Sequence, residues 1–211
     1  MGHLFVKICG ITRLEDALRA VDSGADAIGF NFYSGSKRYI SPIEAGAIVE
    51  ELPSRVLTVG VFVNPEREYV MKILSEVKLG ALQFSGDEPP SAVEGYQLPV
   101  FKAIHVKGID SIHASSLFKV HAFLLDAYRA GEFGGTGRSF DWKIGRKANE
   151  FGKVIVAGGL TPENVADAVR EARPYGVDVS GGVETSPGKK DHKKIETFVS
   201  AAREAHENLE G

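Results

Sequence analysis

Cysteine is almost missing from this sequence, because Cys9 is the only one among its 211 residues. A single thiol cannot form a disulfide within the chain, and it provides no pair of closely spaced cysteines for a metal site. Chains that rely on no disulfide are typical of reducing compartments, so we expect a cytoplasmic protein. With so few thiols, the position of the one that remains becomes informative.

Long apolar runs and an excess of positive charge are also missing. No stretch approaches the roughly 18 apolar residues that a membrane span requires, and the first residues lack the basic segment and long apolar core of a signal peptide. The chain carries 25 Lys+Arg against 28 Asp+Glu, a balance that does not favour nucleic-acid binding. Its one basic stretch, GKKDHKK at 188–194, is interpreted as solvated surface. We therefore expect neither a membrane nor a nucleic acid as a partner.

What the sequence does contain is an alternation of two kinds of segment. Short runs rich in β-branched and aromatic residues predict strands, and the stretches between them have the apolar spacing of amphipathic helices. The predicted strands are 4–8, 27–32, 56–63, 81–84, 100–104, 120–126, 153–157 and 176–180. The clearest predicted helices are 13–24, 41–52 and 161–172, and the helical signal is weakest near 89–96 and 109–118.

Start signals accompany the clearest helices. Thr12, Ser41 and Thr161 are predicted N-caps, because a side-chain oxygen at that position accepts a hydrogen bond from the first helical turn. Pro42 and Pro162 would then occupy the first helical position, where the missing N–H costs nothing.

A strand followed by a helix, repeated about eight times, is typical of a parallel sheet. Two architectures fit this order: a closed (β/α)8 barrel and a doubly wound open sheet. The open sheet would be favoured by a GxGxxG turn after the first strand, and the CGITRLED segment at 9–16 is not that turn. The eightfold count therefore predicts an α/β fold, one (β/α)8 TIM barrel spanning residues 1–211 as a single domain, since no linker-like segment divides the chain.

Active sites of such barrels form at the carboxyl ends of the strands, where two reactive side chains stand. Cys9 ends the first strand and shares a face with Lys7, whose ammonium would stabilise a thiolate. A buried, inert thiol is the alternative. Asp126 closes the apolar run AFLLD, where its carboxyl either caps the next segment or has a raised pKa and donates a proton. Asp178, on the strand beside Lys7 once the barrel closes, is predicted to pair with that lysine.

Glycine is abundant, with 24 residues, and its placement predicts an anion site. Glycine pairs follow the seventh and eighth strands, and paired glycines let backbone N–H groups approach an anion closely. The phosphate site of these barrels usually lies in those two loops. The candidate residues are Gly158, Gly159, Ser180, Gly181 and Gly182.

Two further loops are candidates for the same end of the barrel. Arg38, after the second strand, suits planar recognition of a carboxylate or phosphate. The glycine-rich segment FGGTGRSFDW at 133–142 lacks the lysine of a nucleotide-binding loop and is interpreted as a mobile lid.

Several motifs together resemble a known family from about residue 6 to residue 199. These are KICGIT, GADAIGFNFY, SKRYISP, VGVFVN, LLD…GGTGRSFDW, AGGLTPENV and VDVSGGVE…PGKKDHKKI. The chain resembles the phosphoribosylanthranilate isomerases of tryptophan biosynthesis. The resemblance implies a (β/α)8 barrel without a cofactor, acting as a monomer or homodimer on a small phosphorylated substrate. The implied reaction is the Amadori rearrangement of N-(5-phosphoribosyl)anthranilate to 1-(2-carboxyphenylamino)-1-deoxyribulose 5-phosphate.

The resemblance also implies roles for individual residues. Cys9 matches the family's general base, Asp126 its general acid, and Arg38 the side chain that holds the anthranilate carboxylate. The two glycine loops would hold the phosphate. From its position beside Lys7, and not from the resemblance, Asp178 is also expected to meet sugar hydroxyls. Two positions depart from the family pattern, since Ser85 stands where a histidine is common and Gly181 where a serine is common.

Three other functions remain open from the residues. An isomerase of the related histidine-pathway intermediate usually has aspartates at the ends of strands one and five, whereas this chain has Cys9 and the segment VFKAIHVKG. A non-catalytic barrel that binds a phosphorylated ligand would not need Cys9 and Asp126 together. The lysine and glutamate arrangement of a neighbouring tryptophan-pathway synthase is not visible.

Overall fold

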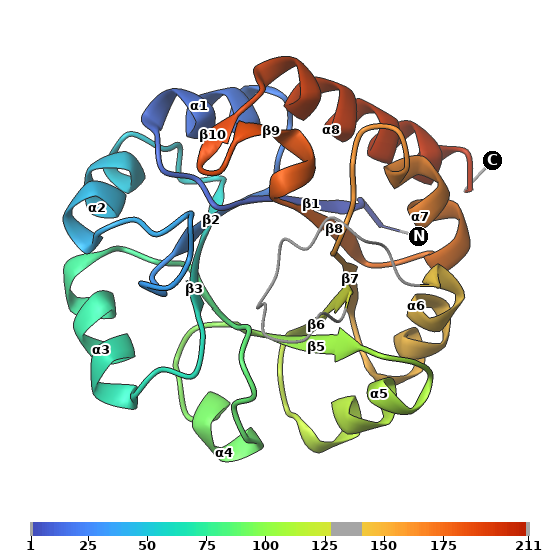
Figure 1. The fold of residues 1–211 in the computed structure, drawn as a ribbon, viewed down its shortest axis with the longest axis horizontal. Coiled ribbons are helices and arrows are strands. Elements are labelled where there is room, and N and C mark those ends of the chain that lie inside the picture. Colours follow the sequence, from blue (N-terminus) through green and yellow to red (C-terminus); the bar gives the residue numbers. More distant parts are fainter. Residues whose placement is uncertain (1, 128–140, 210–211) are drawn as a thin grey trace.

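Eight parallel strands close into a barrel in the order β1-β2-β3-β4-β5-β6-β7-β8. The computed structural model describes residues 2–127 and 141–209, and its helices surround the barrel (Figure 1). The prediction of a closed barrel is confirmed, and the open sheet is excluded. The predicted lid at 133–142 lies outside the described residues except for its last two positions. No helix in the described parts of the chain is long and apolar enough to cross a bilayer.

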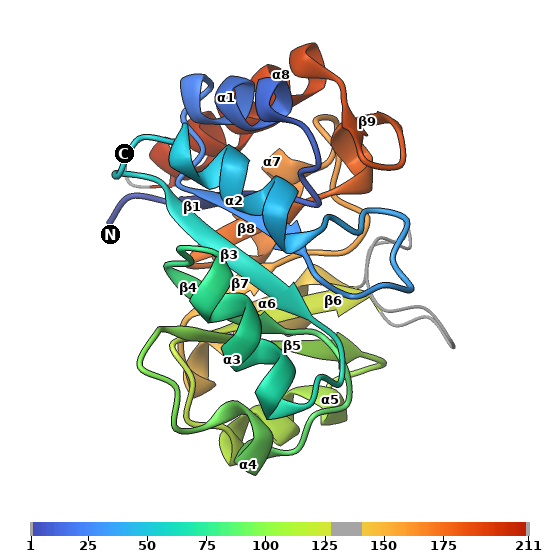
Figure 2. The ribbon, with the colours of Figure 1, turned by 90° about the vertical axis from the view of Figure 1, so that its left-hand side faces the viewer.

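Each predicted strand coincides with an observed one to within about two residues. The barrel strands are β1 (Phe5–Cys9), β2 (Ala27–Asn31), β3 (Leu57–Phe62), β4 (Ala81–Phe84), β5 (Val100–Val106), β6 (Ala122–Ala127), β7 (Val154–Val156) and β8 (Gly176–Val179). A hairpin of β9 (Glu184–Ser186) and β10 (Lys189–Lys190) follows β8. In side view, β9 and the start of β1 lie at opposite ends of the barrel (Figure 2).

The helices follow the predicted order, and the weakly predicted ones are the shortest. They are α1 (Leu14–Asp22), α2 (Pro42–Glu50), α3 (Arg67–Glu76), α4 (Pro90–Val93), α5 (Asp110–His113), α6 (Trp142–Ala148), α7 (Val165–Ala172) and α8 (His192–Glu207). The described residues also contain three 3₁₀ turns: η1 (Ala114–Leu117), η2 (Asn149–Phe151) and η3 (Gly181–Val183).

Only one of the three predicted N-caps is confirmed. Ser41 caps α2 in a reciprocal arrangement with Glu44, and Pro42 is its first residue. Thr12 does not cap α1, because its hydroxyl donates to the Gly188 carbonyl and so ties the loop after β1 to the segment after β8. The prediction for Thr161 is also wrong. Helix α7 begins at Val165, three residues after Pro162, and its N-cap is Asn164.

The barrel interior and the layer outside it have separate apolar cores. Alternate residues of the strands fill the interior, and the larger core lies between the strands and the helices. The interior core consists of Phe5, Ala27, Val59, Ala81, Phe101, Ala103, Ala122, Leu124, Ile155 and Ala157. Because side chains alternate along a strand, Lys7 and Cys9 share the inward face with Phe5, and Asp126 shares it with Leu124. The inward-facing positions nearest the carboxyl ends are therefore free for polar chemistry.

Candidate active site

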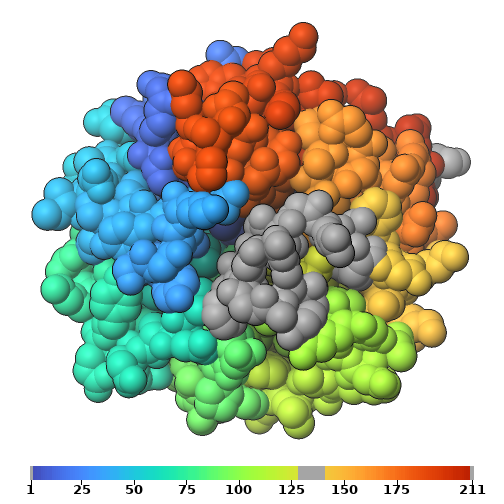
Figure 3. Space-filling model, viewed as in Figure 1, coloured from blue at the N-terminus to red at the C-terminus, as the bar shows by residue number. Residues whose placement is uncertain are grey.

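A cavity of about 440 Å³ opens at the carboxyl ends of the strands. Figure 3 looks onto this face, where the loop after β2 and the segment after β8 border the centre of the barrel. All the residues predicted for the site line this one cavity: Cys9, Arg38, Asp126, Gly158, Gly159, Asp178, Ser180, Gly181 and Gly182. The closure of the barrel thus brings together residues from both ends of the chain.

Cys9 lies at the end of β1 in a buried, charged environment. Beneath it on the same face, the fully buried Lys7 donates a hydrogen bond of 2.8 Å to Asp178 of β8, so the predicted pair is confirmed. Burial raises the pKa of the Cys9 thiol; the Lys7 ammonium opposes this shift, and the Asp178 carboxylate adds to it. The thiol is therefore the main form at neutral pH in the free protein.

Asp126 retains its proton up to a much higher pH than an ordinary carboxyl does. Its side chain lies above the inward-facing Leu124 at the end of β6, and only 7% of the residue is exposed. Burial, and next the charge of Asp178, raise its pKa from 3.8 to about 7, against the smaller effects of the Ala127 N–H and Lys7. Among the described residues, its Oδ1 has no hydrogen-bond partner. A buried carboxyl with a pKa near 7 is suited to donate a proton at neutral pH.

The two glycine loops pack directly against each other and against Asp126. Gly158 has φ +72, and a Cβ there would overlap both Asp126 Oδ1 and the Ala127 backbone N. Gly182, in the η3 turn, lies so close to the Leu160 carbonyl that a Cβ would collide with it. Within the described chain, the buried Oγ of Ser180 has no partner. This concave backbone beside an unpaired hydroxyl can receive an anion.

Arg38 reaches across the cavity rim to Glu184, a contact that the sequence did not predict. Its Nε and Nη2 each donate a 2.8 Å hydrogen bond to the Glu184 carboxylate, one to each oxygen. These bonds raise the pKa of the guanidinium further. At Gly181, where the family commonly has a serine, a Cβ would come within 3.0 Å of Arg38 Nη2, so Gly181 lies directly beside the guanidinium.

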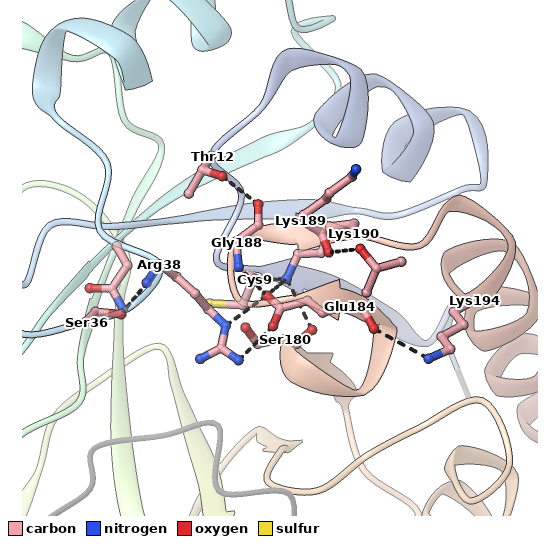
Figure 4. A network of polar contacts seen from close by, with 12 residues as sticks. Cys9, Thr12, Ser36, Arg38, Ser180, Glu184, Gly188, Lys189, Lys190 and Lys194 are labelled. Carbon is pink, nitrogen blue, oxygen red and sulfur yellow. Dashed lines mark hydrogen bonds and ion pairs between the residues drawn. The ribbon is translucent and has the colours of Figure 1, made fainter.

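Lys190 corrects the interpretation of the basic stretch at 188–194. Most of that stretch is partly or fully exposed, but the Lys190 side chain is fully buried. Its Nζ donates to the carbonyls of Cys9 at 2.6 Å and Ser180 at 3.1 Å, and to Glu184 Oε1 at 2.8 Å (Figure 4). No local sequence pattern distinguishes Lys190 from Lys189. The hairpin β9–β10 buries Lys190 and leaves Lys189 exposed.

Gln83 also lines the cavity, and the sequence patterns did not single it out. It lies on the inward face of β4 and is 4% exposed, and its Nε2 donates to Ser85 Oγ at 3.0 Å. In the described chain, its Oε1 has no partner. Its alternation with the inward-facing Ala81 was the signal that could have found it. The described residues contain no group of three or more His, Cys, Asp or Glu that could hold a metal ion.

Comparisons with known proteins agree on one family. The family model described as N-(5'phosphoribosyl)anthranilate (PRA) isomerase matches residues 6–201. The N-(5'-phosphoribosyl)anthranilate isomerase of Pseudomonas fluorescens is 51% identical over 205 residues, which cover 96% of this chain and 100% of that protein.

Two solved structures are similar over nearly their whole length. Monomers generated from the dimeric phosphoribosylanthranilate isomerase of Thermotoga maritima superpose with a TM-score of 0.86 at 42% identity, covering 95% of this chain and 99% of that one. A phosphoribosylanthranilate isomerase in complex with reduced 1-(o-carboxyphenylamino)-1-deoxyribulose 5-phosphate gives a TM-score of 0.85 at 42% identity, with the same coverage.

Proposed function

The chain belongs to the N-(5'-phosphoribosyl)anthranilate isomerase family, and on that basis we propose that Cys9 and Asp126 carry out the isomerisation at the carboxyl end of the barrel. The chain is an isomerase of tryptophan biosynthesis that acts on N-(5'-phosphoribosyl)anthranilate. The observation that supports the assignment of the two residues is their common cavity, which also contains the two glycine loops.

The reaction needs one proton donor and one proton acceptor around the sugar. Protonated Asp126 gives its proton to the furanose ring oxygen as the bond from that oxygen to C1′ breaks, and the anthranilate nitrogen forms a Schiff base with C1′. The Cys9 thiolate then removes the proton from C2′, and the electron pair of that C–H bond moves to form an enolamine. The enolamine tautomerises to the ketone at C2′, and proton exchange returns both side chains to their starting forms.

The active protonation state is a minor tautomer of the free protein. Above neutral pH the two groups together retain one proton, and it lies mostly on Cys9, because the pKa of the thiol is raised whereas that of Asp126 is about 7. The reactive form has that proton on the carboxyl and a thiolate on Cys9, so the two forms differ by a proton transfer and not by the number of protons. Lys190 lowers the pKa of Cys9 and so increases the share of the reactive form. Lys7 lowers the pKa of both Cys9 and Asp126, and its two effects on that share oppose each other.

The remaining cavity residues would bind the two ends and the middle of the substrate. Arg38 Nη1 makes no hydrogen bond to any described residue, which leaves one edge of the guanidinium for the anthranilate carboxylate. The loops with Gly158, Gly159, Ser180, Gly181 and Gly182 would receive the phosphate. Asp178 faces the cavity from β8 and would accept hydrogen bonds from sugar hydroxyls.

The test is a fluorescence assay that follows the loss of phosphoribosylanthranilate in the wild type and in Cys9→Ala and Asp126→Asn. Turnover by the wild type, together with a large loss of kcat in both variants, supports the assignment. Near-normal turnover in either variant would remove that residue from the mechanism.

We also propose that the chain works in the cytoplasm as a monomer or homodimer. A thiol that must cycle through its thiolate requires a reducing compartment, and one relative occurs as a dimer. Light scattering over a range of protein concentrations would distinguish the two oligomeric states.

A further inference from the structure

The buried ammonium of Lys190 joins the ends of two neighbouring barrel strands. A lysine has three N–H donors, and those of Lys190 are used by the carbonyls of Cys9 at the end of β1 and Ser180 after β8, and by the Glu184 carboxylate. Each of these groups comes from a different part of the site: the proposed base, the phosphate loop and the start of β9. The ammonium therefore fixes their separation.

Glu184 extends this connection to the loop after β2. Its carboxylate accepts hydrogen bonds from Arg38 Nε and Nη2, from Lys190 Nζ and, at 3.3 Å, from the Gly188 N–H. The side chain is 5% exposed, whereas that of Arg38 is 18% exposed and faces the cavity. Two parallel bonds to one carboxylate hold a guanidinium in a defined plane. Figure 4 shows Arg38, Cys9, Lys190 and Glu184 gathered in one network at this end of the barrel.

We propose that Glu184 and Lys190 are a buried positioning pair, which holds the Arg38 guanidinium ready for the substrate carboxylate and anchors the Cys9 end of β1 to the phosphate loop. The proposal builds on the function proposed above, because it assigns Arg38 and Cys9 their roles in that reaction. Neither member of the pair needs to contact the substrate.

The charges of the pair give it a signature that a purely structural contact would lack. Arg38 and Lys190 together carry two positive charges and Glu184 one negative charge, so the group as a whole favours anions. Removing the Glu184 charge leaves the Lys190 ammonium less compensated beside Cys9, which should lower the pKa of the thiol. Removing the Lys190 charge should raise it. Substitutions of Glu184 and of Lys190 break the same ion pair, yet they should shift the pKa of Cys9 in opposite directions.

Other charged groups also face Cys9, and the experiment leaves all of them unsubstituted. They are Lys7 on its own strand, Asp178 on β8, Asp126 on β6 and Arg38 from the loop after β2. None of them is substituted in these variants. Arg38 does lose its partner in Glu184→Gln, but its positive charge, like that of Lys190, favours the thiolate, so both effects lower the pKa of Cys9.

The molecule contains a matched control pair. Lys102 and Glu88 are buried to a similar degree, with 3% and 2% side-chain exposure and a Nζ to Oε2 distance of 2.9 Å. As at Lys190, the lysine also donates to two carbonyls, those of Gly86 and Ala103. This pair does not line the cavity. Breaking it with Glu88→Gln should therefore reproduce the loss of stability without the effects on the site.

The experiment compares the wild type with Glu184→Gln, Lys190→Met and Glu88→Gln. Because Cys9 is the only cysteine, the rate of alkylation by iodoacetamide as a function of pH reports its pKa directly, and it requires no turnover. Steady-state kinetics with phosphoribosylanthranilate give kcat and KM, and urea unfolding gives the stability of each variant.

The proposal predicts a rise in KM of about 10- to 100-fold in Glu184→Gln, the usual effect of losing a hydrogen bond to a charged group, with a smaller change in kcat. The alkylation pKa should fall in Glu184→Gln and rise in Lys190→Met, while Glu88→Gln leaves both KM and the pKa unchanged. An unchanged KM in Glu184→Gln, or pKa shifts of the same sign in both variants, would overturn it. If Lys190→Met does not fold, the KM of Glu184→Gln and the direction of its alkylation pKa shift decide whether the proposal stands.

The two levels of inference fail differently. A wild type without turnover would refute the proposed function but leave the alkylation result intact. A wild type with normal turnover, together with a Glu184→Gln variant that matches Glu88→Gln in every measurement, would refute the positioning pair alone.

Discussion

Replacing Asp126 with Asn should stabilise the protein at neutral and alkaline pH while it abolishes most of the activity. The structure raises the pKa of this carboxyl from 3.8 to about 7, chiefly because burial penalises its charged form. A tenfold change in a protonation equilibrium corresponds to about 1.4 kcal/mol, so this rise in pKa means that the ionised carboxylate should cost about 4 kcal/mol in the free energy of unfolding. Asparagine has nearly the same shape and no charge, and its oxygen can still accept the Ala127 N–H.

The pH window follows from the direction of the pKa change. Below about pH 4, Asp126 is protonated in both the folded and unfolded chains, and its titration contributes nothing. Between about pH 4 and pH 7 the unfolded chain has released this proton while the folded chain retains it, so the wild type loses stability as the pH rises. Above about pH 7 both states are ionised and the penalty stays constant. The variant lacks this titration entirely.

Urea unfolding of both proteins at pH 5 and at pH 8 measures the effect. The stability of Asp126→Asn relative to the wild type should increase by about 3 kcal/mol between these two values, most of the total penalty. Any constant cost of burying the amide cancels in this difference. A stability difference that does not change with pH would mean that Asp126 has an ordinary pKa in the folded protein, and the reasoning that makes it the proton donor would fail.

Three further substitutions test the site in other ways. Cys9→Ala should lower kcat by about 10²- to 10⁴-fold, the usual contribution of a general base, with its far-UV circular dichroism unchanged; normal turnover would contradict this role. Arg38→Ala should act mainly on KM, because its contact with the carboxylate would exist in both the ground and the transition state, and an unchanged KM would exclude it from binding. Gly158→Ala should lower both stability and kcat, since the added methyl group would displace the Asp126 carboxyl and strain a left-handed backbone; wild-type values of kcat and unfolding midpoint would show that the loop yields instead.

The positions of the strands could be predicted from the sequence because they depend on short-range patterns. Alternating β-branched and aromatic residues between glycine- and polar-rich turns locate each strand, and the strand ends then locate Cys9 and Asp126. The Lys7–Asp178 pair could also be predicted, since closing a barrel makes the first and last strands neighbours and their inward faces are set by alternation. Helix starts were less predictable, because the hydroxyl of Thr12 is used in a long-range contact with Gly188.

The electrostatic environment of the site could not be predicted from the sequence, because it depends on which groups form hydrogen bonds and ion pairs with each charged side chain. Lys190 looks like any other lysine in a basic stretch, and Glu184 like the end of a glycine loop. Their burial results from the way the hairpin β9–β10 folds over the ends of β1 and β8. The same holds for Gln83, whose unpaired oxygen is evident only once the facing side chains are in place.

Local sequence was sufficient to specify the barrel, the order of its strands and the chemical types at their ends, because these follow from periodicity and from residues that are near one another in the chain. How those groups are charged and held depends instead on contacts that form when the barrel closes. Lys190 meets the Cys9 carbonyl across 181 positions of sequence, and Asp126 keeps its proton through burial by its neighbours. Desolvation and hydrogen bonding act over a few ångströms of space. The separation of two residues along the chain does not show whether they lie that close together.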